Sequence, residues 1–218
     1  MLGDRIGDAG NFLGGQNRIG RYSNMLQYSI LPTEGFNASL GIVPEEGMEN
    51  RGGILIGADY TADPLFVGLG YTKWGKANTT NGTDDQKTTQ LLAGYKVSDE
   101  LKLMAVYQKT SNLGNTSTAK LAVIGAGVAY SLSPETTFKA QYYQADETAS
   151  NAKNGATMLA AAVDYALSDT TTVYVAYATG SNEDNARYTP LNWGHGQSPA
   201  ISAGNDPSGI SVGAVHKF

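Results

Sequence analysis

Cysteine is absent from the 218 residues, which excludes disulfides, thiolate nucleophiles and cysteine metal sites. Long apolar runs are absent too: no stretch reaches the roughly 18 to 20 residues of a transmembrane helix, and the first residues do not have the pattern of a signal peptide. Hydrophobic residues make up only 41%, below the approximately 45 to 50% of soluble domains. A helical membrane protein is therefore excluded, and an ordinary soluble core is not favoured.

Charge and catalytic motifs are equally sparse. The net charge is −5 without a run of like charge, so neither a nucleic-acid groove nor a polybasic membrane patch is predicted. The chain has no glycine-rich phosphate loop followed by Lys-Ser or Lys-Thr, and its residues do not form a recognisable pair of nucleophile and base, so we expect no catalytic residue and no cofactor. His195 has no second histidine nearby, and the pairs Asp84-Asp85 and Glu183-Asp184 lack the spacing of a calcium loop, so we expect solvated loop residues rather than metal ligands.

Glycine and tyrosine are plentiful, with 27 Gly and 13 Tyr against 5 Phe and 2 Trp. The tyrosines form two series, each with a period of 35 residues. The first series is Tyr60, Tyr95, Tyr130 and Tyr165, and the second is Tyr107, Tyr142 and Tyr177. The segments between the two series centre on Ser-Asp or Ser-Pro, which is turn chemistry. The repeat is therefore predicted to be a β-hairpin with a tight turn.

The residues around each turn alternate between two faces. Leu91, Ala93 and Tyr95 share one parity, whereas Gln90 and Lys96 have the other. An apolar face and a polar face with period two predict half-buried strands. We expect eleven strands, near residues 19–31, 35–43, 53–62, 65–74, 87–97, 101–109, 120–132, 136–144, 157–167, 171–178 and 210–218.

Long polar segments join the hairpins at their other ends, and the longest runs from residue 179 to 209. Short turns at one end and long loops at the other are typical of an outer-membrane β-barrel, in which the tyrosines would form a girdle above the short turns. The alternative is a soluble β-sandwich. The constant strand length and the fixed distance of one aromatic residue from each turn count against the sandwich.

The last strand alternates from Ile210 to Phe218. Its pattern Val-Gly-x-x-His-x-Phe resembles the final strand of the Gram-negative porin family. The resemblance implies that the barrel-assembly machinery reads this strand. The matching residues are Val212, Gly213, His216 and Phe218.

The start of the chain is similar to the end of a porin constriction loop followed by a strand, which Arg21, Asn24 and Tyr28 mark. The resemblance implies an all-β, antiparallel transmembrane barrel. Residues 1–218 would be a single porin domain, with 1–18 as the end of the constriction loop and 19–218 as strands and loops. Eleven strands are those that follow the third loop of a sixteen-stranded barrel, so we expect a chain truncated at its N-terminus.

Charged and polar residues of the loop and of the polar face are expected to line the pore and bias ion passage. In the alternative, the loop charges pair with one another and fasten the loop to the wall, and both roles can hold together. These candidate residues are Asp4, Arg5, Asp8, Arg18, Arg21, Gln27, Asp59, Lys96, Lys102, Lys139 and Asp164.

The resemblance implies passive diffusion of ions and small hydrophilic solutes through a homotrimer. The protein would contact outer-membrane lipid, lipopolysaccharide and the assembly machinery. The alternatives are a non-conducting barrel that serves adhesion or anchoring, a sandwich that acts as a binding module, and a sugar channel. A sugar channel needs a ladder of lumen aromatics, and Tyr143 and Tyr174 are too few for one. The preference for anions or cations stays open.

Overall fold

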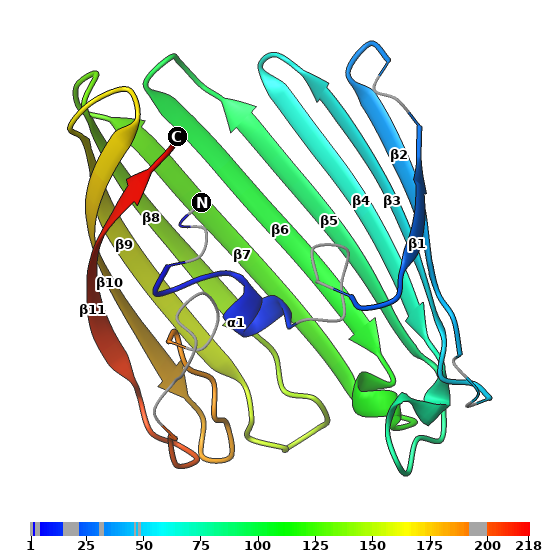
Figure 1. Cartoon of the computed structure of the whole chain (residues 1–218). Coiled ribbons are helices and arrows are strands. Elements are labelled where there is room, and N and C mark those ends of the chain that lie inside the picture. Colours follow the sequence, from blue (N-terminus) through cyan, green and yellow to red (C-terminus); the bar gives the residue numbers. More distant parts are fainter. Residues whose placement is uncertain are drawn as a thin grey trace.

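The computed structural model describes residues 2, 5–14, 22–30, 33–45, 47, 49–191 and 200–218. Eleven strands form one antiparallel sheet in which each strand pairs with the next one in the chain (Figure 1). They are β1 (Leu26–Ser29), β2 (Phe36–Val43), β3 (Gly53–Ala62), β4 (Leu65–Trp74), β5 (Gln86–Lys96), β6 (Leu101–Ser111), β7 (Lys120–Ser131), β8 (Thr136–Ala145), β9 (Ala156–Ala166), β10 (Thr171–Asn182) and β11 (Ser208–His216).

The sheet is curved, and an N-terminal segment lies over its concave face (Figure 1). This segment contains α1 (Gly10–Leu13), and two 3-10 turns, η1 (Lys76–Asn78) and η2 (Leu113–Asn115), lie in the long loops. β1 and β11 form the two edges, so the sheet of this chain is open. One sheet with an exposed apolar face excludes the sandwich, which needs two sheets packed face to face.

No helix in the described part of the chain is long and apolar enough to cross a membrane.

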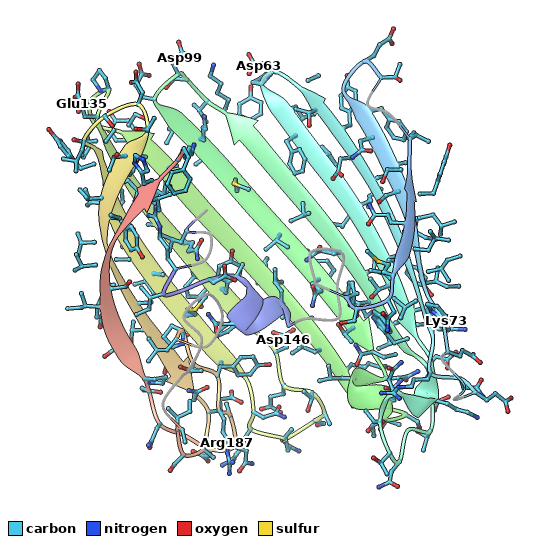
Figure 2. All side chains as sticks on the ribbon, in the orientation of Figure 1. Asp63, Lys73, Asp99, Glu135, Asp146 and Arg187 are labelled. Atoms are coloured by element: carbon cyan, nitrogen blue, oxygen red, sulfur yellow. The ribbon has the colours of Figure 1, made fainter. Side chains whose placement is uncertain are left out.

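The short turns repeat one hydrogen-bonding device. The hydroxyl oxygens of Ser98, Ser133 and Ser168 each accept the backbone N–H of the residue three positions later, at 3.2, 3.1 and 3.1 Å. A serine hydroxyl that replaces a backbone acceptor stabilises such turns, and the three serines recur with the same 35-residue period as the tyrosines. Figure 2 places Asp63, Asp99 and Glu135 at this end of the sheet, and Lys73, Asp146 and Arg187 at the opposite end, with the long loops.

Both tyrosine series lie on the convex, exposed face. The first series stands at the ends of β3, β5, β7 and β9, next to the short turns. The second series lies six residues into the following strands, at Tyr107 of β6, Tyr142 of β8 and Tyr177 of β10. In the register of the sheet, each tyrosine of the first series lies opposite the residue four positions before a tyrosine of the second series, as Tyr95 lies opposite Leu103. Four residues correspond to about 13 Å of strand, so the expectation of one girdle is wrong, and there are two rings at different heights.

The predicted strands agree with the structure to within two residues at each end, except at two places. The first strand was expected over 19–31, but residues 22–25 are not extended and β1 covers only Leu26–Ser29. Asn24 has a left-handed φ of 55°, and Tyr22 packs on Trp74 with ring centroids 4.9 Å apart, so the chain leaves the wall here. β10 continues four residues beyond the predicted end, paired with β9 as far as Asn182 and Ala156.

The buried apolar residues lie between the N-terminal segment and the concave face. Phe12 and Leu13 pack with Val123, Tyr143 and Met158. Leu2 and Ile6 pack on the alanines at positions 160, 162, 176 and 178. Each such side chain, fully buried, contributes about 2 kcal/mol, so the segment is docked mainly by apolar burial.

Candidate functional site

The candidate site is the seat of the segment 5–14, called here the inner loop, on the polar face of the sheet. Three buried glutamines of that face donate amide hydrogen bonds, and two of them are linked to each other. Gln90 Nε2 donates to Gln108 Oε1 at 3.1 Å, and Gln108 Nε2 donates to the carbonyl oxygen of Leu13 at 2.7 Å. Gln141 Nε2 donates to the carbonyl oxygen of Gly7. The wall side chains thus satisfy backbone acceptors of the inner loop, at Gly7 and at the end of α1.

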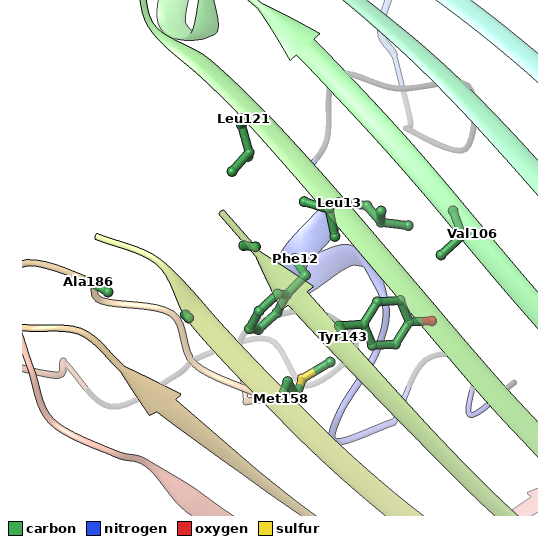
Figure 3. Packing of buried hydrophobic residues seen from close by; sticks show 10 residues of the cluster. Phe12, Leu13, Val106, Leu121, Tyr143, Met158 and Ala186 are labelled. Atoms are coloured by element: carbon green, nitrogen blue, oxygen red, sulfur yellow. The ribbon is translucent and has the colours of Figure 1, made fainter. Parts of the chain in front are cut away.

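Apolar contacts complete the seat. Figure 3 shows Phe12 beside Met158 and Tyr143, and the rings of Phe12 and Tyr143 have centroids 6.3 Å apart. At the other end of the inner loop, Gly7 has a φ of +81°, and a Cβ there would lie 2.4 Å from the Cβ of Ala160. Only glycine fits both the backbone conformation and this close approach. The inner loop therefore lies directly against the wall of β8, β9 and β10.

Three of the predicted charged residues meet at this seat. Asp164 of β9 accepts hydrogen bonds from Arg5 and from Lys139 of β8, the latter at 2.8 Å. The Arg5 guanidinium also lies over the ring of Tyr174, 4.0 Å from its centroid. The side chains of Arg5 and Asp164 are each 12% exposed, so solvent weakens the pair only in part. Two cations and one carboxylate leave one positive charge at the edge of the inner loop.

The loop charges were expected either to bias ion passage or to fasten the loop to the wall, and their contacts can be compared with both roles. The pair of Arg5 and Asp164 joins the inner loop to the wall, as the fastening alternative requires. Asp8 serves the loop itself, because its carboxylate accepts the backbone N–H of Gly10 at the start of α1. Asp4, Arg18 and Arg21 lie outside the described residues, as does His195.

The other predicted pore residues lie apart from this cluster. Lys96 and Lys102 face each other across β5 and β6 at the short-turn end, where Lys96 Nζ is 2.6 Å from a carboxylate oxygen of Asp99. Gln27 and Asp59 border a hollow of about 230 Å³ on the inner side of β1 to β3. The structure therefore brings Arg5, Lys139 and Asp164 together and places Gln27, Asp59, Lys96 and Lys102 elsewhere along the wall.

The residues of the C-terminal pattern have different surroundings. Val212 is exposed on the convex face, and a Cβ on Gly213 would lie 2.6 Å from the Tyr174 hydroxyl oxygen. His216 Nδ1 is 2.9 Å from the Thr171 hydroxyl oxygen. The ring of Phe218 is fully exposed apart from an edge contact with His216, with centroids 5.2 Å apart. Their reading by the assembly machinery stays a prediction.

The acidic pairs of the long loops are accessible to solvent, and Asp85, Glu183 and Asp184 also make contacts within these loops. Lys73 Nζ lies 2.8 Å from Asp85 and, by its hydrogen bond, lowers the pKa of that carboxyl. Lys153 does the same to the pKa of Asp184, and Glu183 accepts the backbone N–H of Gly155 at 2.8 Å. No group of three or more His, Asp or Glu that could hold a metal ion is present in the described ranges.

Sequence reasoning missed several residues of the site. Gln108 and Gln141 have the parity of the polar face, but the sequence did not place them at the inner loop, and Tyr188 and Pro190 fell within the long polar segment 179–209. Phe12-Leu13, an apolar pair in a glycine-rich segment, is the one local signal that could have indicated docking. Tyr143 and Tyr174 lie on the inner face as predicted.

The fold and the site together define the wall of an outer-membrane β-barrel with an inward-folded loop. The family model of Gram-negative porins matches residues 2–185. The chain belongs to this family, whose members lie in the outer membrane of Gram-negative bacteria. A search of curated proteins finds no match.

Solved structures of porins share the fold. The anion-selective porin from Comamonas acidovorans is similar with a TM-score of 0.76 and 21% identity, over 89% of this chain and 59% of its own. The outer-membrane expressed OmpT of Vibrio cholerae is similar with a TM-score of 0.64 and 18% identity, over 96% of this chain and 71% of its own. The chain thus spans 59% of the length of the first of these porins. At these identities the likeness establishes the fold alone.

Proposed function

We propose that the protein forms a water-filled pore through which ions and small hydrophilic solutes diffuse passively. The inner loop carries this proposal, because it is fastened by Gln108, Gln141 and Asp164 to the polar face that would line the lumen. A polar lining replaces part of the water around a solute, and an inward loop narrows the passage so that it filters by size. No step needs a cofactor or a catalytic residue.

The complete pore would be a sixteen-stranded barrel to which residues 1–218 contribute eleven strands. We propose a homotrimer that contacts outer-membrane lipid and lipopolysaccharide and is assembled through the C-terminal strand. Family membership supports these points. The positive charge left by Arg5, Lys139 and Asp164 would favour anions at the inner loop. The structurally similar porin from Comamonas acidovorans is described as anion-selective.

The test uses the complete protein, purified from a strain without other porins and inserted into planar lipid bilayers. We expect conductance steps of uniform size, and liposomes that contain the protein should swell in small sugars faster than in large ones. A folded, heat-modifiable barrel that gives neither conductance nor swelling would overturn the proposal and favour the non-conducting alternative. The same preparation, unfolded by heating, serves as the control.

A further inference from the structure

The loop between β10 and β11 begins by folding back into the concave side of the sheet. Its first part, residues 183–191, is called here the outer strap, and residues 186–191 of it lie beyond the residues matched by the family model. The carbonyl oxygen of Pro190 accepts the backbone N–H of Gly7 at 2.7 Å and Nδ2 of Asn11 at 3.3 Å. Pro190 is fully buried, so the outer strap is packed against the inner loop.

Tyr188 of the outer strap contacts the inner loop and also lines a hollow on the concave side of the sheet. Its ring lies on that of Phe12, with centroids 4.7 Å apart. It also borders a hollow of about 400 Å³ whose opposite wall consists of the inner faces of β5 and β6, including Gln86 and Thr110. Tyr188 belongs to the segment that follows β10, and its ring faces β5 and β6 across the hollow. The ring would therefore occupy part of the cross-section of the lumen.

Asn182, the last residue of β10, holds the outer strap in this inward path. Its Oδ1 accepts the backbone N–H of Tyr188 at 2.9 Å, and its Nδ2 donates to the carbonyl oxygens of Tyr188 at 2.9 Å and Asn205 at 2.7 Å. One amide therefore fixes both backbone groups of Tyr188 and ties the strap to the returning part of the loop. Asn182 therefore holds the outer strap through the hydrogen bonds of a neutral amide, without a charge and without a catalytic role.

We propose that Tyr188 is a size-determining residue of the pore and that Asn182 is its positioning residue. The inference rests on the proposed diffusion function and adds a second narrowing element to the inner loop. Neutral solutes would pass between the Tyr188 ring and the wall of β5 and β6. The bulk of the ring, rather than its hydroxyl, sets their limiting size, because the ring packs on Phe12 and faces the hollow.

The test measures single-channel conductance of the complete protein with neutral polyethylene glycols of increasing mass. Tyr188→Ala should raise the conductance on the order of 1.5-fold and admit larger polymers, because part of the narrow cross-section opens. Tyr188→Phe should behave as the wild type, and Tyr188→Trp should lower the polymer limit. The matched control is Arg187→Ala, because Arg187 is exposed at the long-loop end and should leave the polymer limit unchanged (Figure 2).

Asn182→Ala should raise the polymer limit as Tyr188→Ala does, and the double variant should add nothing further, because both changes remove the same obstacle. Asn185→Ala, in the same strap, should have no effect. An unchanged limit in Tyr188→Ala refutes the inference, and if that variant does not assemble, an unchanged limit in Tyr188→Trp does so instead. Absence of any wild-type conductance refutes the diffusion function itself, which is a different result.

Discussion

Replacing Asp164 with Asn in the complete protein tests the charge cluster at the inner loop. The substitution keeps the size of the side chain but removes the carboxylate that accepts from Arg5 and Lys139. Two changes should follow. The inner loop loses part of its attachment, and the lumen gains a positive charge that is no longer compensated.

The magnitudes follow from burial and distance. The pair is neither fully exposed nor fully buried, at 12% exposure on each side, so its loss should cost about 2 kcal/mol, between surface and buried ion pairs. This corresponds to a roughly 30-fold shift in the equilibrium between docked and undocked loop. The apolar contacts of Leu2, Ile6, Phe12 and Leu13 remain, so the loop stays docked most of the time. An unpaired cation attracts an anion 4 Å away by about 1 kcal/mol in water, or about fivefold local enrichment.

Two electrical measurements separate these effects. In a salt gradient the reversal potential of Asp164→Asn should shift toward anions, and the shift should shrink between about 0.1 M and 1 M salt as the screening length falls from roughly 10 to 3 Å. Brief fluctuations of the current should also become more frequent. Asp169→Asn is the matched control, because Asp169 is exposed in the short turn between β9 and β10. An unaltered reversal potential at low salt would refute the placement of this cluster in the lumen.

Three further predictions concern the ends of the strands. Deleting Phe218 should strongly reduce the amount of heat-modifiable barrel but should hardly lower the melting temperature of the barrel that does form. The exposed ring of Phe218 contributes less than about 2 kcal/mol to the stability of the barrel. Equal effects on the amount and on the melting temperature would contradict this prediction. Asn115→Ala should destabilise the loop 75–85 by about 2 kcal/mol and make it sensitive to protease, because the buried amide of Asn115 donates to the carbonyl oxygens of Trp74 and Asp84. Protection from protease equal to that of the wild type would argue against this role of Asn115. The ion pair with Lys73 lowers the pKa of the Asp85 carboxyl. The stabilisation of the loop 75–85 by this pair is therefore complete at neutral pH, and it disappears as the pH falls below about 4 and through the lowered pKa of Asp85. Hydrogen exchange should show this loss in the wild type but not in Asp85→Asn.

The strands could be predicted because each one is encoded locally. The alternation of residues 120–132 predicts β7 to within one residue, and the serine-centred turns determine which strands are neighbours. The first strand was wrong because alternation continues through Tyr22 to Met25 although the backbone at Asn24 is left-handed. A local pattern does not reveal where a chain turns away from a wall.

The candidate site could be predicted only in part. Arg5, Lys139 and Asp164 were expected in the lumen, but nothing in the sequence pairs residues 5 and 164 with each other. The contact of Phe12 with Tyr188 joins two irregular segments from opposite ends of the chain, and neither segment has a periodicity that relates it to the other. Such contacts depend on the shape of the curved sheet, which exists only after the strands have paired.

The alanine seat under the inner loop has a consequence for how permeability can change. Gly7 rests on Ala160 and Ala178, which are completely buried and so are not reached by a passing solute. A larger side chain at either alanine would lift the loop away from the wall and toward the axis of the lumen. The calibre of such a channel can therefore be adjusted from behind its narrowest part, by residues hidden from everything that permeates it.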